Sequence, residues 1–170
     1  MRLRFRLFWL LISSFWKERL SVLDTSVVHL RVHVNDVDVR KVSGDRYFAF
    51  ADLGWGDAYI RWGAFKRVLK GECAPVGQVL TIKVRQALWL FQTFQVHTKV
   101  LWWDDRWIYV EQRFMRGGEP VAICVLKGGL LKDQKLVPVS EWVPGAATTP
   151  KPEVPESVRA LQHLEKAIQW

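Results

Sequence analysis

Two carboxylates, Asp36 and Asp38, stand two residues apart directly after a segment in which apolar and polar residues alternate. A carboxylate in such a position can act as a general base or as a nucleophile. The pair could also bind Mg²⁺, although the sequence places no third carboxylate directly beside it. Aspartate is also common as a loop-forming residue at the end of a strand. Spacing alone leaves these three alternatives open.

The residues that follow the pair predict the start of a helix. Ser43 and Asp45 are candidate N-caps, and Gly44 between them would let the backbone come close to a ligand. Amide groups of a first helical turn carry partial positive charge, so those near Gly44 and Arg46 could polarise a carbonyl. As an N-cap, Asp45 would compete for the same donors. Tyr47 heads an apolar stripe, which favours a place in the core over one in a pocket.

Hydrophobic periodicity predicts the elements that position these residues. Alternation over residues 28–34 predicts a half-buried strand, and apolar intervals of three and four from about Asp45 to Trp62 predict a long helix. Gly54 within that helix indicates close packing against a neighbour. Four antiparallel strands are predicted between residues 80 and 131, with Gly117–Gly118 as a hairpin turn. This order predicts an α+β fold in which an antiparallel sheet wraps around one helix.

Composition limits the class of protein and its partners. The chain has 170 residues, of which 49% are hydrophobic and 25% are charged, so it can bury one sizeable core. The net charge of +8 favours anionic partners such as phosphorylated ligands or lipid headgroups. About half of the ten tryptophans fall in predicted strands or near the N-terminus, so nucleic acid is not expected as a partner. Two cysteines make no disulfide framework, which favours a reducing, cytoplasmic setting.

The ends of the chain differ in composition from its middle. Residues 1–22 are basic and aromatic, and their uninterrupted apolar run from Leu7 to Ile12 is too short to cross a bilayer. They predict an amphipathic helix that either docks on the domain or lies on the inner face of an anionic membrane. A cleaved signal segment is the third alternative. Residues 143–154 are proline-rich and predict a linker, and residues 155–170 predict a C-terminal amphipathic helix. The main domain is therefore expected at residues 23–142.

The segment from Arg31 to Gly54 resembles the 4-hydroxybenzoyl-CoA thioesterase-like group of hot-dog proteins, and especially a bacterial branch related to thioesterase superfamily member 6. The motif of that family reads Asn-Asp-x-Asp and, a few residues later, His-Met-Asn-Asn-x-Arg-Tyr. This chain has Lys41–Asp45 in place of the His-Met-Asn-Asn, and residues 103–107 are also similar to that branch. The motif positions that it keeps are Asn35, Asp36, Asp38, Arg46 and Tyr47.

The resemblance implies a hot-dog fold and an acyl-CoA thioesterase, which hydrolyses acyl-CoA or another acyl thioester. It gives Asp38 the role of the carboxylate that attacks the carbonyl or activates a water. Coenzyme A then enters as part of the substrate, and no separate cofactor or metal is expected. Relatives pair their sheets and place the site between subunits, so a homodimer or a dimer of dimers is expected. The loop residues that would surround the substrate are Asp36, Gly44, Asp45, Arg46 and Tyr47.

The change at Lys41–Asp45 falls in the loop where the family builds its active site. It favours, as the alternative, a hot-dog module that binds acyl thioesters or lipids without turnover.

Overall fold

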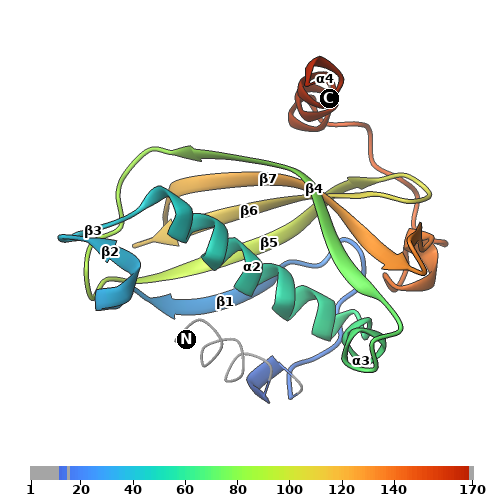
Figure 1. Ribbon diagram of the computed structural model, residues 1–170, viewed down its shortest axis with the longest axis horizontal. Helices are drawn as coiled ribbons and strands as arrows, with labels where there is room; N and C mark the ends of the chain where they lie inside the picture. Colours follow the sequence, from blue (N-terminus) through green and yellow to red (C-terminus); the bar gives the residue numbers. More distant parts are fainter. Residues whose placement is uncertain (1–11, 15, 169–170) are drawn as a thin grey trace.

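The computed structural model describes residues 12–14 and 16–168 of the chain. In this part, the main sheet has the strand order β1-β5-β6-β7-β4, with a short β8 beside β7, and neighbouring strands run antiparallel. Figure 1 shows the sheet curled around the long helix α2 (Gly44–Arg61), as predicted for an α+β hot-dog fold. The strands of the sheet are β1 (Ser26–Arg31), β4 (Ala74–Val84), β5 (Thr93–Trp103), β6 (Ile108–Arg116), β7 (Glu119–Lys132) and β8 (Lys135–Leu136).

Short elements join these parts, and one further helix closes the chain. Residues 12–14 are helical, whereas residues 1–11 of the predicted basic helix lie outside the described residues, so its membrane contact stays a prediction. None of the helices in the described part has the length and apolar character needed to span a bilayer. The additional elements are the hairpin β2 (Val37–Asp38) and β3 (Lys41–Val42), the 3-10 turns η1 (Val34–Asp36) and η2 (Val139–Glu141), and the helices α3 (Phe65–Leu69) and α4 (Glu156–Ala167).

The ends of α2 follow from local chemistry. Ser43 is the N-cap, with the extended backbone (φ −70°, ψ 155°) that capping residues adopt. At the other end Gly63 has a φ of 83°, which glycine reaches without a steric penalty. The amide of Gly63 donates to the carbonyl of Ile60 at 2.9 Å, and that of Ala64 donates to the carbonyl of Tyr59 at 3.1 Å. These bonds form a Schellman motif, which ends the helix.

The first strand is shorter than its sequence pattern predicts. Alternation predicted a strand over residues 28–34, but β1 ends at Arg31 and the chain turns into η1. The cause is Asp36, whose Oδ2 accepts a hydrogen bond from the amide of His33 at 2.8 Å. This bond closes a turn within three residues and directs the chain away from the sheet.

Gly54 lies at a close contact between α2 and the sheet. A Cβ on this residue would lie 2.7 Å from Thr98 Oγ1, 2.8 Å from Gln112 Nε2 and 2.9 Å from Val96 Cγ1. Real Cβ atoms do not come this close to neighbouring atoms, so the contact requires glycine. The predicted close packing at Gly54 is confirmed.

We expect Gly54→Ala to lower the free energy of unfolding by about 1–2 kcal/mol. Overpacking of a core costs ~1–3 kcal/mol, and the ~1 kcal/mol advantage of alanine over glycine in a helix offsets part of it. Urea unfolding would measure the difference. Gly44→Ala is the matched control, because a Cβ there meets no atom within 4 Å. Equal stability of the Gly54→Ala protein and the wild type would contradict the close contact.

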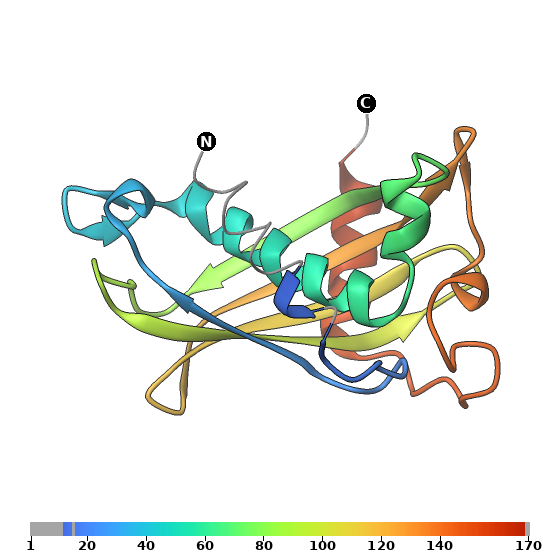
Figure 2. The same ribbon diagram turned by 90° about the horizontal axis from the view of Figure 1, so that it is seen from below.

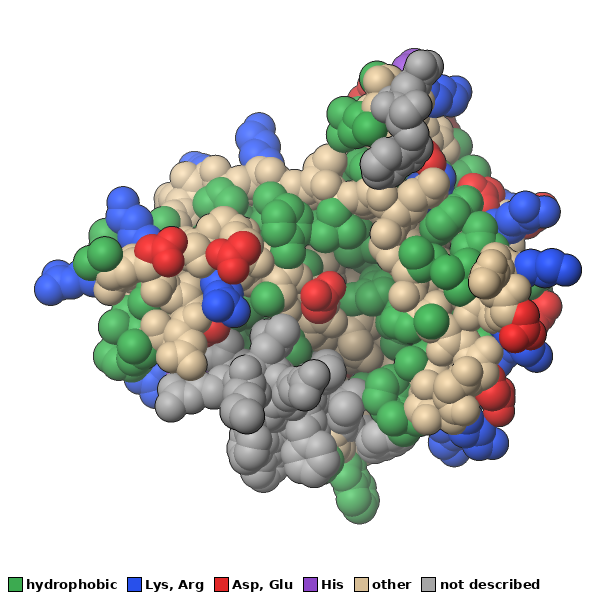
Figure 3. All heavy atoms as spheres, viewed as in Figure 1, with side chains coloured by type: hydrophobic (Ala, Val, Ile, Leu, Met, Phe, Trp, Pro, Cys, Tyr) green, Lys and Arg blue, Asp and Glu red, His purple; other side chains and the backbone are tan. Residues whose placement is uncertain are grey.

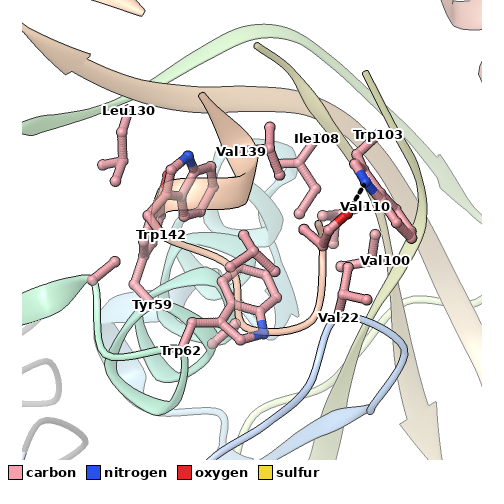
Figure 4. Packing of buried hydrophobic residues seen from close by; sticks show 14 of the residues in the cluster. Val22, Tyr59, Trp62, Val100, Trp103, Ile108, Val110, Leu130, Val139 and Trp142 are labelled. Atoms are coloured by element: carbon pink, nitrogen blue, oxygen red, sulfur yellow. Dashed lines mark hydrogen bonds between the residues drawn. The ribbon is translucent and has the colours of Figure 1, made fainter. Parts of the chain in front are cut away.

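A second part of the core joins the end of α2 to the segment after β8. Trp142 stacks on Tyr59 with ring centroids 5.3 Å apart, and Figure 4 shows Trp62 beside them. The indole of Trp103 donates to the carbonyl of Ala146 at 3.2 Å, which is the dashed line in Figure 4. The first residues of the predicted linker are therefore buried in the core. The predicted domain boundaries themselves stay a prediction.

The helix α4 covers the face of the sheet that points away from α2. Its Val158 and Leu161 are buried against Tyr109 of β6, on the face opposite to the main core. Lys127 of β7 forms an ion pair with Glu165 of α4 at 2.8 Å. In Figure 2 the strands pass between α2 and the red C-terminal helix. Because β7 is covered on both sides, its nearly continuous apolar sequence is explained.

Candidate active site

The loop between β1 and α2 is held closed by Asp36. This residue is 6% exposed, and its carboxylate accepts the hydrogen bond from the His33 amide described above. Its main-chain carbonyl accepts a bond from the amide of Ser43 at 3.4 Å, at the start of α2. Asp36 thus connects the start of the loop, at His33, to its end, at Ser43. These contacts hold the main chain of the loop itself.

Asp38 lies on the surface, at the end of β2. It is exposed, and it pairs with Lys41 across the β2–β3 hairpin. The amide of Arg40 donates to the main-chain carbonyl of Asp38 at 2.6 Å, which closes a tight turn. An open hollow of about 460 Å³ is lined by this hairpin and by Trp89. Asp38 therefore has free access to solvent and to a ligand in the hollow.

The other wall of the hollow comes from the connection between β4 and β5. The amide of Val42 donates to the carbonyl of Leu88 at 2.9 Å, and that of Leu90 donates to the carbonyl of Arg40 at 3.0 Å. The ammonium group of Lys41 lies 5.2 Å from the centroid of the Trp89 ring. Sequence reasoning missed Trp89. Its only signal in the sequence is a tryptophan in the apolar run Ala87–Phe91 between two predicted strands, and nothing there says that the hairpin pairs with it.

Tyr47 is buried at 2% exposure and does not line the hollow. Its hydroxyl accepts a hydrogen bond from the amide of Leu88 at 3.0 Å. Its ring packs edge-on against Phe114, with centroids 5.5 Å apart. Burial raises the pKa of the Tyr47 hydroxyl, so it stays protonated at neutral pH. Tyr47 acts by fixing the connection that carries Trp89.

The first turn of α2 presents an open face with a charge of its own. Gly44 has no heavy atom within 4 Å of its Cβ direction. A hydrogen bond from the Ser43 side chain lowers the pKa of Asp45, and the nearby Arg46 guanidinium lowers it further. Arg46 Nε lies 3.6 Å from Asp45 Oδ2, and both side chains are well exposed. Asp45 is therefore ionised at neutral pH and paired with Arg46, and the N-cap is Ser43.

The two carboxylates of the predicted pair have separate environments. The Asp36 carboxylate is turned to the amide of His33, whereas Asp38 is exposed on the hairpin. Within the described residues, no three His, Cys, Asp or Glu side chains gather where they could hold a metal ion. Burial, aided by the charge of Asp52, raises the pKa of the Cys124 thiol to about 12. Cys124 is therefore no nucleophile at neutral pH.

The structure thus divides the predicted site residues into three groups. Asp38 borders the hollow, Asp36 and Tyr47 support its walls, and Asp45 with Arg46 forms an ion pair at the start of α2. Asp38 is thus a surface carboxylate beside an open hollow, and it stands close in the chain to the N-terminus of the long helix. A carboxylate in such a place can act as a general base or as a nucleophile.

The fold and the sequence together define the class of protein. The chain belongs to the thioesterase-like superfamily, whose sequence model matches residues 32–161. Among curated proteins it is similar to Protein THEM6 of Drosophila melanogaster, with 24% identity over 148 residues, which are 85% of this chain and 75% of the fly protein. It is also similar to Protein THEM6 of Xenopus laevis, with 35% identity over 85 residues, which are 50% of this chain and 41% of the frog protein.

Solved structures share the fold at low sequence identity. A gentisyl-coenzyme A thioesterase has a TM-score of 0.63 and 18% identity, with 68% of this chain and 96% of that chain covered. A DHNA-CoA thioesterase from Staphylococcus aureus has a TM-score of 0.60 and 12% identity, with 84% of this chain and 94% of that chain covered. At such identities the likeness concerns the fold.

Proposed function

We propose that the protein is an acyl-CoA thioesterase-like hydrolase that uses Asp38 as its carboxylate base or nucleophile. The observation that carries the proposal is the exposed Asp38 carboxylate on a loop fixed by Asp36, beside a hollow of about 460 Å³. Membership of the thioesterase-like superfamily supports the choice of a thioester as substrate. Coenzyme A belongs to the substrate in this proposal, and no further cofactor takes part.

The proposed reaction consumes one water and releases one thiol. Asp38 either takes a proton from the water that attacks the thioester carbonyl, or attacks that carbonyl itself to give an anhydride that water then hydrolyses. In both routes the carbon–sulfur bond breaks, and the thiolate leaves as the free thiol after it takes up a proton. The amides at the start of α2, near Gly44, are the proposed donors to the carbonyl oxygen.

The proposal is tested by incubating the pure full-length chain with acyl-CoAs of several chain lengths. Free thiol released above the uncatalysed rate is the expected result. No release from any substrate, with binding retained in calorimetry, would favour the second candidate function instead. That candidate is a module that binds acyl thioesters or lipids without turnover. The observation in its favour is the sequence Lys41–Asp45, which replaces the His-Met-Asn-Asn of related loops.

We further propose a homodimer, formed along the open edge of the sheet. In the described part of the chain β4 pairs with β7 alone, so its other edge carries unpaired backbone groups. Leu80 and Val84 of this strand are exposed at 37% and 45%. An exposed edge of 11 residues is usually paired or covered, and a second copy of the chain would do both.

We expect light scattering at micromolar concentration to give twice the chain mass of 19.8 kDa, or four times that mass for a dimer of dimers. Leu80→Lys should shift the protein toward the monomer, because it places a charge on the paired edge. Leu69→Lys is the control, since Leu69 is 65% exposed on α3 and is not part of the β4 strand. A monomeric wild type would contradict the dimer and any site shared between subunits.

A further inference from the structure

Large hydrophobic side chains gather at the end of the molecule that carries β2 and β3. Of the exposed large hydrophobics in the described residues, four belong to this end, and we call them the aromatic tip. They come from two segments that lie side by side, because the amide of Phe91 donates to the carbonyl of Val32 at 3.0 Å. The members of the aromatic tip are Val34 (59% exposed), Val39 (95%), Trp89 (41%) and Phe91 (54%).

Two members of the aromatic tip have a backbone conformation that is unfavourable for their residue types. Val39 has a φ of 56° and Phe91 a φ of 66°. Bulky and β-branched residues rarely adopt this left-handed conformation, which suits glycine or asparagine. A residue kept at such a position against its backbone preference indicates a role for its side chain. That role is not packing in the core, since both side chains are exposed to solvent.

Cationic side chains surround the aromatic tip. The Arg31 guanidinium lies 5.6 Å from the centroid of the Phe91 ring, and the Lys41 ammonium lies 5.2 Å from that of Trp89. Arg40 is exposed on the same hairpin. Asp38 is the one exposed acid in residues 31–42 and 88–92, so the net charge there is positive. Figure 3 shows Lys and Arg side chains beside hydrophobic ones at this end, on the left, with acidic side chains next to them.

The tip is also held rigid from within. Arg116 donates to the carbonyl of Ala87 at 3.4 Å and to Gln92 Oε1 at 3.0 Å, and the same Gln92 oxygen accepts a bond from the amide of Trp89. Together with the Tyr47–Leu88 bond, these contacts fix the connection on both sides of Trp89. A fixed set of outward-facing hydrophobic groups loses little conformational entropy on binding.

We propose that the aromatic tip is a docking surface for an anionic lipid bilayer. Aromatic rings with adjacent Lys or Arg suit the interface of a membrane, where the rings enter the headgroup layer and the cations meet lipid phosphates or carboxylates. A second copy of the chain has a better site in the open edge of β4, where unpaired backbone groups accompany apolar side chains. The surface differs from the basic segment at residues 1–22, and lipid binding through it does not depend on hydrolysis.

The experiment measures co-sedimentation of the full-length protein with vesicles, at low and at high salt. Vesicles of phosphatidylcholine alone are compared with vesicles of phosphatidylcholine and phosphatidylserine. We expect binding to the anionic vesicles that weakens with salt, because salt screens the headgroup charge. Val39→Asn with Phe91→Asn should lower the affinity by about tenfold or more. Asparagine accepts the left-handed backbone, so this variant should fold, and thermal unfolding checks that it does.

Matched controls separate this surface from the rest of the protein. Leu69→Asn removes a hydrophobe from α3 whose exposure, 65%, lies between those of Phe91 and Val39, and should bind like the wild type. Lys41→Gln should weaken binding about fivefold, whereas Lys70→Gln, on the exposed C-cap of α3, should not. Undiminished binding of the Val39→Asn, Phe91→Asn protein would overturn the proposal and move the contact to residues 1–22. Loss of dimerisation in that variant would overturn it too, by making the tip an interface between copies.

Discussion

Replacing Asp38 with asparagine is expected to lower thioester hydrolysis by about 10²–10⁴-fold, which is the usual contribution of a general base. The amide has the shape of the carboxylate but can neither accept a proton from water nor attack a carbonyl. Stability should stay within about 0.5 kcal/mol of the wild type, because Asp38 is exposed and its structural hydrogen bond comes from its main chain. Thiol release and urea unfolding of the same preparation measure both effects.

Two neighbouring carboxylates provide the controls for Asp38. Asp36→Asn should mainly lower stability, by about 1 kcal/mol, because it weakens the buried bond to the His33 amide. Equal, modest losses of activity at Asp36 and Asp38 would make the pair structural. Full activity of Asp38→Asn would move the chemistry to Asp45, which stands in the altered loop and is ionised at neutral pH.

Sequence reasoning predicted the fold because its main signals are local. Periods of two and of 3.6 residues mark strands and helices, and the helix predicted from about Asp45 to Trp62 runs from Gly44 to Arg61. The Gly117–Gly118 turn joins β6 to β7 as predicted, with φ angles of 59° and 87°. The end of β1 at Arg31 could not be predicted in this way, because the side chain of Asp36, further along the chain, ends the alternation by bonding to the His33 amide and closing η1.

The candidate site could be predicted only in part, because its walls come from distant parts of the chain. Asp36 and Asp38 stand out in the sequence, but their different burial depends on how the loop turns. Trp89 borders the hollow through main-chain pairing with residues more than 40 positions earlier, which no local pattern encodes. The same holds for Tyr47, whose hydroxyl fixes the main chain at Leu88.

Asp57, one turn before the end of α2, is a further residue that periodicity could not identify. It is fully buried, and a buried carboxylate requires hydrogen-bond donors or cationic side chains as partners. Its Oδ1 accepts hydrogen bonds from the Ser14 hydroxyl and, at 2.7 Å, from Lys17 Nζ. Its Oδ2 accepts a bond from the Ser26 hydroxyl and lies 3.6 Å from Arg61 Nη1. These contacts join α2 to β1 and to the segment that precedes it.

We expect Asp57→Asn to lower the free energy of unfolding by about 3 kcal/mol, the low end of the range for breaking a buried ion pair. The asparagine side chain lacks the negative charge that Lys17 and Arg61 face. Its NH₂ group is a donor, and it would face the donors that bond to a carboxylate oxygen in the wild type. The low end applies because the Lys17 side chain is 33% exposed, so water can solvate its charge once Asp57 is neutral. Urea unfolding measures the loss.

Asp52→Asn is the matched control for Asp57→Asn, because Asp52 is on the same helix and exposed. Partial desolvation by neighbouring groups raises the pKa of Asp52 even though its side chain reaches solvent, so its charged form is not stabilised by folding, and neutralising it should not destabilise the protein. Lys17→Met completes a double-mutant cycle with Asp57→Asn. A coupling energy near zero, or a loss below about 1 kcal/mol for Asp57→Asn, would contradict the assignment. A strong coupling would instead identify this carboxylate as the group that fastens the segment around Ser14 and Lys17 to the central helix.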